Sequence, residues 1–214
     1  MKISPYMFEP YQYKHPCVEE VKEVQMFYEK RLTELGYKNR DNISFTEICN
    51  YFSRYYFGIR HIAKEDIKDR FDKPKRSLFL FGNTGAGKTL AIQIFSKIFN
   101  IEFFFADDLA RIYAIDGEKY FWSYLNEFDG KDIIIDDLGA EREVKKYGNK
   151  SPFVDFLFHR EKMYKKNRVL THFTTNATNR DVLIEKYGDR VVSRLLGMCE
   201  FIRVNASDAR VGKI

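Results

Sequence analysis

An eight-residue run from Gly82 to Thr89, Gly-Asn-Thr-Gly-Ala-Gly-Lys-Thr, has the composition and spacing of a phosphate-binding loop. It fits the pattern G-x-x-x-x-G-K-[ST], with Gly82, Gly87, Lys88 and Thr89 at the specified positions. Such a loop surrounds nucleotide phosphates with backbone N–H groups, while its lysine reaches the β- and γ-phosphates and its hydroxyl can ligate Mg²⁺. We therefore expect nucleotide binding by Gly82, Asn83, Thr84, Gly85, Ala86, Gly87, Lys88, Thr89 and Leu90.

Two carboxylates, Asp136 and Asp137, follow three consecutive isoleucines further along the chain. The isoleucines predict a buried parallel strand, and acids at the tip of such a strand need a cation or hydrogen bonds to compensate their burial. In a phosphate-loop fold this tip lies beside the Mg²⁺, so we expect Asp136 and Thr89 to be the metal ligands. Asp137, or Glu141 four residues on, is then placed to orient or deprotonate the attacking water.

Asn176 and two arginines complete the residues that could carry chemistry. Asn176 ends the run His-Phe-Thr-Thr-Asn, and its amide suits it to hold a water molecule near the γ-phosphate, although asparagine is also common where a strand turns. Arg190 and Arg194 are four residues apart, on one face of a predicted helix. They could stabilise the charge that develops in phosphoryl transfer, in trans from another subunit, or form ordinary surface ion pairs.

Alternating apolar strands and helices must position these residues. Strands are predicted at residues 78–81, 101–105, 132–136, 169–175 and 200–204. Helices are predicted at 88–98, 107–114, 119–127, 152–166, 180–187 and 189–196, with Thr178 opening the fifth as part of a capping box. This alternation predicts the α/β class, with a five-stranded parallel sheet covered by helices, in a domain of residues 75–214.

Residues 1–74 have no strand–glycine–helix pattern and read as a small helical segment. Apolar residues recur at helical spacing from Val18 to Leu35, and Ser44 opens a second helix through a capping box. Aromatic residues are dense around positions 51–57, so this segment is expected either to pack on the other domain or to dock a partner. Pro74 marks a short linker between the two parts.

Composition and charge narrow the class of protein. The 214 residues are 44% hydrophobic and 31% charged, and no apolar run approaches the roughly 20 residues of a membrane span, so we expect a cytoplasmic protein without a membrane partner. Three isolated cysteines suggest neither a disulfide framework nor a zinc site. The net charge of +5 is concentrated in residues 141–168, a strip that could follow a nucleic-acid backbone or be an ordinary solvated surface.

Taken together, the motifs resemble those of the DnaC-type bacterial replicative-helicase loaders. That family of AAA+ ATPases also includes the ATPases that assist insertion-sequence transposases. The similar segments are the phosphate loop, Ile-Ile-Ile-Asp-Asp-Leu-Gly-Ala-Glu ending at Glu141, Thr-Thr-Asn ending at Asn176, and Gly-Asp-Arg-Val-Val-Ser-Arg-Leu-Leu starting at Gly188. They fall within roughly residues 77 to 210.

The resemblance implies a role for each motif. Gly82 to Thr89 would be the Walker A loop for ATP and Mg²⁺, and Asp136 with Asp137 would be the Walker B acids. Asn176 would take the sensor 1 position, and Arg194, with Arg190 as companion, would be an arginine finger in a neighbour's site. The resemblance further implies an ATP-dependent oligomer, binding to single-stranded DNA, and attachment of a hexameric replicative helicase to residues 1–74.

Some features depart from the wider AAA+ pattern. Aspartate stands at position 137 where most AAA+ proteins carry glutamate, so slow hydrolysis is expected. No helical lid domain is expected, and Arg210 is the candidate for the sensor 2 arginine. Three other readings remain open: a transposition-regulating ATPase that acts with a transposase on DNA, a small-molecule kinase built on the phosphate loop, and a switch or adaptor that binds ATP without hydrolysing it.

Overall fold

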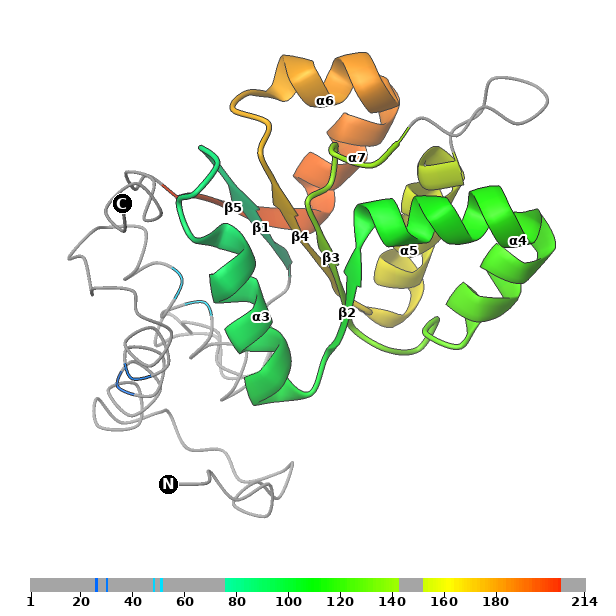
Figure 1. Ribbon diagram of the computed structural model, residues 1–214, viewed down its shortest axis with the longest axis horizontal. Coiled ribbons are helices and arrows are strands. Elements are labelled where there is room, and N and C mark those ends of the chain that lie inside the picture. The colour runs from blue at the N-terminus through cyan, green and yellow to red at the C-terminus, as the bar shows by residue number, and fades with distance from the viewer. Residues whose placement is uncertain are drawn as a thin grey trace, which may run out of the picture.

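A computed structural model describes residues 76–142 and 152–204, together with Met26, Lys30, Ile48 and Tyr51. Its strands are β1 (Ser77–Phe81), β2 (Glu102–Phe105), β3 (Ile133–Asp136), β4 (Thr171–Thr175) and β5 (Cys199–Arg203). Its helices are α3 (Lys88–Phe99), α4 (Ala106–Asn126), α5 (Pro152–Asn167), α6 (Arg180–Tyr187) and α7 (Asp189–Met198). Strands and helices alternate as predicted, and apart from α4 their bounds differ from the predicted ones by no more than two residues (Figure 1).

The five strands form one sheet with the order β2-β3-β4-β1-β5, and every neighbouring pair is parallel. The predicted α/β class with a five-stranded parallel sheet is therefore confirmed. In this order β4 lies between β1 and β3, so a side chain just beyond the end of β4 can reach the loops that follow both neighbours. Ligands of open α/β sheets bind at this carboxyl edge of the strands.

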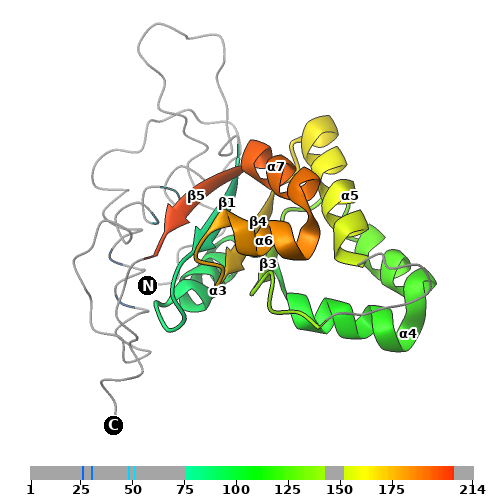
Figure 2. The same ribbon diagram turned by 90° about the horizontal axis from the view of Figure 1, so that it is seen from above.

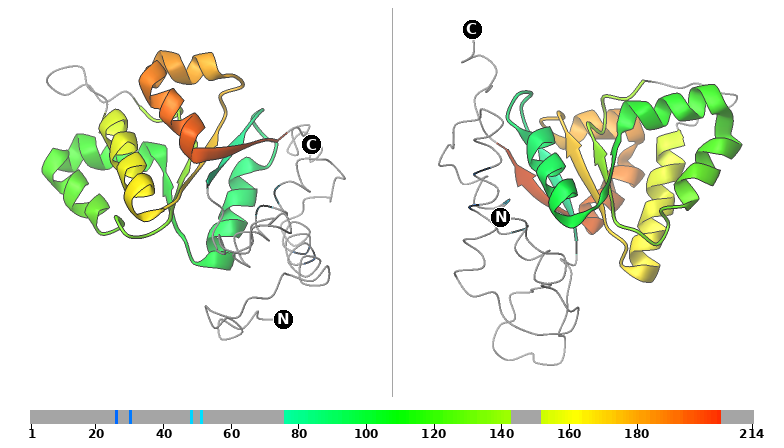
Figure 3. Two further views of the ribbon diagram at one scale, coloured as in Figure 1. Left: turned by 180° about the vertical axis from the view of Figure 1, so that it is seen from behind. Right: turned by 60° about the horizontal axis from the view of Figure 1, so that its bottom comes forward.

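Helices cover both faces of the sheet (Figures 2 and 3). Side chains alternate along each strand, so Phe79 and Phe173 pack with α4, α5, α6 and α7, while Leu78, Leu80 and Ile134 pack with α3. Burial on both faces explains why β1 and β3 are apolar runs rather than alternating sequences. Ile48 and Tyr51 also belong to the core on the α3 side, so these two residues of the predicted N-terminal segment pack on the same side of the sheet as α3.

The structure confirms one local prediction and corrects another. The helices predicted at 107–114 and 119–127 correspond to the two parts of α4, which are separated by a kink at Gly117, where the backbone is not helical (φ 84°, ψ 173°). Helix α6 is capped by Asn179 rather than Thr178, because the Asn179 side chain accepts a hydrogen bond from the N–H of Val182 at 3.2 Å. The cap therefore lies one residue later than the capping box suggested.

Several predictions fall outside the described residues. Except for the four residues named above, the helices and linker predicted within residues 1–74 are not described. The same holds for three lysines of the basic strip, at positions 145, 146 and 150, and for Arg210. In the part of the chain that is described, no helix combines the length and apolar character that a bilayer span requires.

Candidate nucleotide-binding site

The predicted phosphate loop connects the end of β1 to the first turn of α3. Gly87 is the N-cap of the helix and has a left-handed backbone (φ 92°), and the N–H of Ala91 bonds to its carbonyl at 3.0 Å. Gly82 also has positive φ (136°), and a Cβ at this position would lie 2.4 Å from the carbonyl oxygen of Val204. Glycine is therefore required at Gly82 by both conformation and space. The loop ends at a helix N-terminus, where backbone N–H groups and the helix dipole favour an anion.

Lys88 is buried, and its ammonium lies inside the loop. Its Nζ donates to the carbonyl oxygens of Gly82 and Asn83 and to Oδ1 of Asn176, each at 2.8 Å. Three oxygen acceptors satisfy a buried ammonium, which has three N–H donors. The same tetrahedral donor set suits phosphate oxygens in place of these acceptors.

Asp136 lies at the tip of β3 against the first turn of α3. Its Oδ1 accepts hydrogen bonds from Oγ1 of Thr89 at 3.3 Å and from Oγ1 of Thr174 on β4. The carboxyl group is fully buried. Its second oxygen, Oδ2, forms no hydrogen bond with any residue that the structure describes. Burial raises the pKa of Asp136 above its usual value, and the bonds from the two threonines offset only part of that rise.

The chemistry of this pair fits Mg²⁺. A buried carboxylate with one orphaned oxygen is unfavourable unless a cation compensates it. Hydroxyl and carboxylate oxygens are the protein ligands that Mg²⁺ accepts, with water and phosphate oxygens filling its remaining positions. Thr89 and Asp136 therefore fit as the two protein ligands of a nucleotide-bound Mg²⁺.

Asn176 links the phosphate loop to the second acid. Its Nδ2 donates to Oδ1 of Asp137 at 2.8 Å, while its Oδ1 accepts from Lys88. Asp137 has a left-handed backbone (φ 57°), and its N–H donates to Oγ1 of Thr174 at 3.0 Å. Thr174 thus forms hydrogen bonds with both acids. The small polar residues at the end of this strand were the only signal of that role in the sequence. The structure brings Lys88, Asp136, Asp137 and Asn176 together at one edge of the sheet.

The carboxylate of Glu141 is engaged elsewhere, which argues against its predicted role as the catalytic base. It is buried, accepts from the hydroxyl of Tyr187 and from the N–H of Gly139 (2.8 Å), and pairs with Lys186 at 3.2 Å. Burial, followed by the charge of Glu141, raises the pKa of the Tyr187 phenol, so this hydroxyl stays a donor. Gly139 turns the chain (φ 102°) toward α6, so Glu141 anchors the loop after β3 to that helix.

Arg190 and Arg194 lie on α7 and contact α5 rather than the phosphate loop. Both guanidinium groups cover the ring of Phe158, at 5.6 and 4.8 Å from its centroid. Arg194 also donates to Oε2 of Glu161, whose Oε1 pairs with Lys165 at 2.6 Å. Burial raises the pKa of Glu161, but the hydrogen bonds from Lys165 and Arg194 outweigh it and leave the pKa below its usual value. Sequence reasoning missed Phe158 and Glu161, because only the packing of α5 on α7 brings them to the arginines.

The fold therefore places a phosphate-loop sequence after β1, a buried acid at the tip of β3 and an amide after β4, on a parallel sheet of order β2-β3-β4-β1-β5. Solved structures of other proteins have a similar fold. The crystal structure of the DnaC helicase loader matches with a TM-score of 0.53 and 20% identity, over 78% of this chain and 94% of that one. The crystal structure of DnaI matches with a TM-score of 0.55 and 17% identity, over 78% of this chain and 88% of that one.

The resemblance noted from the motifs is therefore confirmed at the level of the fold, which this chain shares with the DnaC helicase loader and DnaI structures. No protein-family model matches the sequence, and no curated protein matches it either. At identities of 20% and 17% the structural likeness carries the fold alone, so activity and partners must be argued from the site.

Proposed function

We propose that this protein is an AAA+ helicase loader, which binds and hydrolyses ATP and delivers a hexameric replicative helicase to single-stranded DNA. The observation that carries the proposal is the network of Lys88, Asn176 and Asp137 beside Asp136, on a fold shared with DnaC and DnaI. A small-molecule kinase has less support, because no observation points to an acceptor pocket near this network in the described residues.

The chain's own residues supply each part of an ATP site. ATP binding requires Lys88 to exchange carbonyl acceptors for the β- and γ-phosphate oxygens, while backbone N–H groups at the N-terminus of α3 would bind the phosphates. Thr89 and Asp136 would hold Mg²⁺, which would neutralise charge on the phosphates. When the Lys88 ammonium binds the phosphates, it no longer donates to Oδ1 of Asn176. That amide oxygen can then accept a hydrogen bond from a water molecule and orient it.

Asp137 is the proposed group that activates the attacking water. Its Oδ1 is held by Asn176 at 2.8 Å, so the two side chains act at one position. Aspartate is one methylene shorter than glutamate, and the water must therefore approach closer to the strand tip. A displacement of this kind reduces general-base efficiency, and we expect slow hydrolysis.

The remaining parts of the proposal concern assembly. Arg194, with Arg190 beside it, would reach the nucleotide of a neighbouring subunit in an ATP-dependent oligomer, as an arginine finger does. The helicase would attach to residues 1–74. Ile48 and Tyr51 of that segment pack against the α3 side of the core, so at least this part of the proposed arm shares a core with the nucleotide-binding domain.

Nucleotide binding is tested by Lys88→Ala, with Lys97→Ala on the exposed end of the same helix as the matched control. Losing the charged hydrogen bonds to phosphate should weaken ATP binding about 10- to 100-fold, measured by titration with a fluorescent ATP analogue. The control should bind as the parent protein does. Equal affinity of the Lys88 variant and the parent would remove the phosphate-loop assignment.

Helicase loading onto single-stranded DNA is tested with the full chain and the replicative helicase of its host. We expect ATP to increase the retention of helicase on beads carrying single-stranded DNA when the protein is present, and the Lys88→Ala variant to abolish that increase. Failure of the two proteins to associate at micromolar concentration would contradict the loader function. Assembly on duplex DNA together with a transposase would instead favour the transposition ATPase.

A further inference from the structure

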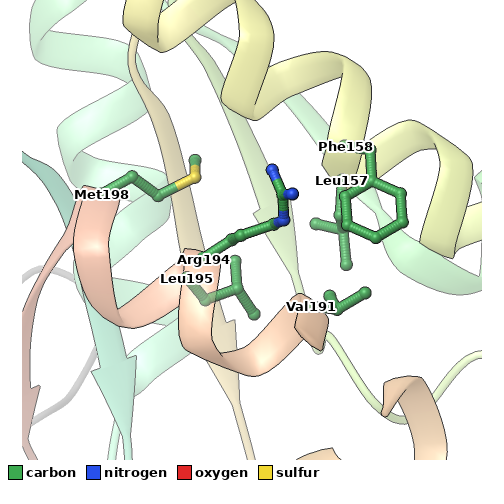
Figure 4. A pocket seen from close by; sticks show the side chains of 6 residues that line it. All are labelled: Leu157, Phe158, Val191, Arg194, Leu195 and Met198. Atoms are coloured by element: carbon green, nitrogen blue, oxygen red, sulfur yellow. The ribbon is translucent and has the colours of Figure 1, made fainter. Parts of the chain in front are cut away.

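The contact between α5 and α7 is mostly apolar but contains one buried acid. Leu157, Val191, Leu195 and Met198 line a small pocket between the two helices, and Arg194 and Phe158 complete its lining (Figure 4). Glu161 lies in the same contact with its side chain only 8% exposed. A carboxylate in such an apolar contact costs stability unless it is paired, and apolar side chains would pack there without that cost.

Glu161 and Phe158 hold the guanidinium of Arg194 from two directions. The ring of Phe158 lies 4.8 Å beneath the guanidinium carbon, and Oε2 of Glu161 accepts a hydrogen bond from Nη1. Phe158 and Glu161 are three residues apart on α5, so both face α7. The side chain of Arg194 remains 32% exposed, and a guanidinium has five N–H donors, so donors remain for a further anion.

We propose that Glu161 and Phe158 are positioning residues that fix the rotamer of Arg194, so that its remaining donors reach the nucleotide of a neighbouring subunit. The inference rests on the proposed oligomeric ATPase. Arginine has several rotatable bonds, and holding them before the neighbour docks removes an ordering cost from the transition state. Arg190 is exposed and contacts the same ring at 5.6 Å without an ion pair among the described residues, so its side chain is held less firmly.

The primary test is Glu161→Gln, with Lys165→Gln as its matched control. Lys165 pairs with the other oxygen of the same carboxylate at 2.6 Å, but its side chain is 68% exposed and does not contact Arg194 in any described interaction. We expect Glu161→Gln to lower kcat of the assembled protein about tenfold, with ATP affinity of the single subunit unchanged. Lys165→Gln should stay within about twofold of the parent.

Phe158 provides an independent variant if the glutamine change harms folding. Phe158→Leu removes the aromatic face and should reduce kcat in the same way, whereas Phe158→Tyr keeps the ring and should restore activity. If Glu161 instead sequestered Arg194, Glu161→Gln would raise kcat. A rise in kcat, or loss of activity in the tyrosine variant equal to that in the leucine variant, would overturn the inference.

Mixed oligomers separate a positioning role from a general loss of structure. Glu161→Gln subunits keep an intact ATP site, while Asp137→Asn subunits bind ATP, lack the water-activating acid and keep an intact Arg194. Mixing the two should restore hydrolysis, because the second subunit supplies a positioned arginine to the first. Mixing Glu161→Gln subunits with subunits that carry both changes should not restore hydrolysis, because neither subunit then supplies a positioned arginine. Equal results from both mixtures would overturn the inference.

The Arg194→Ala variant distinguishes failure of this inference from failure of the proposed function. If Arg194→Ala lowers kcat while Glu161→Gln behaves as the parent, the arginine acts without the positioning residues and only the inference falls. If Arg194→Ala leaves the kcat of the assembled protein unchanged, the finger role and the inference fall together, while ATP binding stands on the Lys88→Ala result.

Discussion

Replacing Thr174 by valine removes one hydroxyl from the centre of the candidate site while keeping the shape of the side chain. This hydroxyl donates to Oδ1 of Asp136 and accepts the N–H of Asp137 at 3.0 Å. Thr174 is fully buried, so bulk water cannot replace either bond. The variant leaves the Asp136 carboxylate with its longer bond from Thr89, at 3.3 Å, and leaves the Asp137 N–H without its acceptor.

The expected loss of stability follows from these two bonds. Leaving a buried polar group without its partner costs about 1–3 kcal/mol, and the cost is higher when one partner is charged. Two groups are affected, so the free energy of unfolding at neutral pH should fall by about 3 kcal/mol. For a folded unit of this size each kcal/mol shifts the melting temperature by about 2–4 °C, which predicts a decrease of about 6–12 °C.

The pH dependence of this loss has a definite sign. Burial raises the pKa of Asp136 in the folded protein above its ordinary value of 3.8. The stability that proton binding provides is therefore complete below pH 3.8 and is lost as the pH rises through the folded pKa. Thr174 donates to the ionised form and lowers that pKa, so removing it raises the pKa further and enlarges the loss at neutral pH.

Thr175→Val is the control for this measurement. Its hydroxyl donates to the carbonyl of Leu138 at 2.6 Å and accepts the N–H of Ala177 at 3.1 Å, so it also makes one bond of each kind, but none to a carboxylate. Thermal and urea unfolding should show a deficit for Thr174→Val that shrinks as the pH is lowered from neutral through the raised folded pKa of Asp136, and a nearly constant deficit for Thr175→Val. A Thr174→Val deficit below about 1 kcal/mol, or one independent of pH, would refute the reasoning.

Two further predictions concern the phosphate loop and the amide beside it. Gly82→Ala should destabilise the folded chain by about 3 kcal/mol or more, because its Cβ would lie 2.4 Å from the Val204 carbonyl oxygen. Gly87→Ala has open space and should cost only about 1–2 kcal/mol of backbone strain, so equal melting temperatures would contradict the packing argument. Asn176→Ala should lower ATP hydrolysis about 10- to 100-fold in a phosphate-release assay, with ATP affinity nearly unchanged because the groups proposed to bind the phosphates are not altered; an unchanged rate would contradict the role of the amide.

The fold and the centre of the site could be predicted from the sequence because local patterns determine them. Apolar strands alternate with helices, and parallel strands bring their carboxyl ends to one edge, which is enough to expect Lys88, Asp136 and Asn176 near one another. The role of Glu141 could not be predicted in this way. Its spacing from Asp137 suggested an alternative to Asp137 as the base, but the turn at Gly139 directs its side chain to Tyr187.

The partners of the arginines are a second case that spacing could not predict. The helical pattern correctly placed Arg190 and Arg194 on one helix, yet it contained no information about which helix would pack against them. Glu161 and Phe158 lie about thirty residues earlier in the chain, and they reach the arginines only because α5 and α7 share a core. Long-range pairs of this kind depend on the packing of whole elements, whereas caps and loops depend on a few adjacent residues.

The alternation of side chains along β4 relates the N-terminal segment to the nucleotide site. His172, Thr174 and Asn176 are two residues apart, so a single face of this strand and its extension carries all three. Nδ1 of His172 accepts the N–H of Leu78 at 3.0 Å and lies 3.5 Å from the hydroxyl of Tyr51, which itself donates to the carbonyl of Arg76 at 2.7 Å. The dense aromatic residues around position 51 were compatible with two interpretations: packing of the N-terminal segment on the other domain, or docking of a partner. Because Tyr51 is fully buried against the strand face that leads to Thr174 and Asn176, partner contacts of the proposed arm must be made by other residues of the segment.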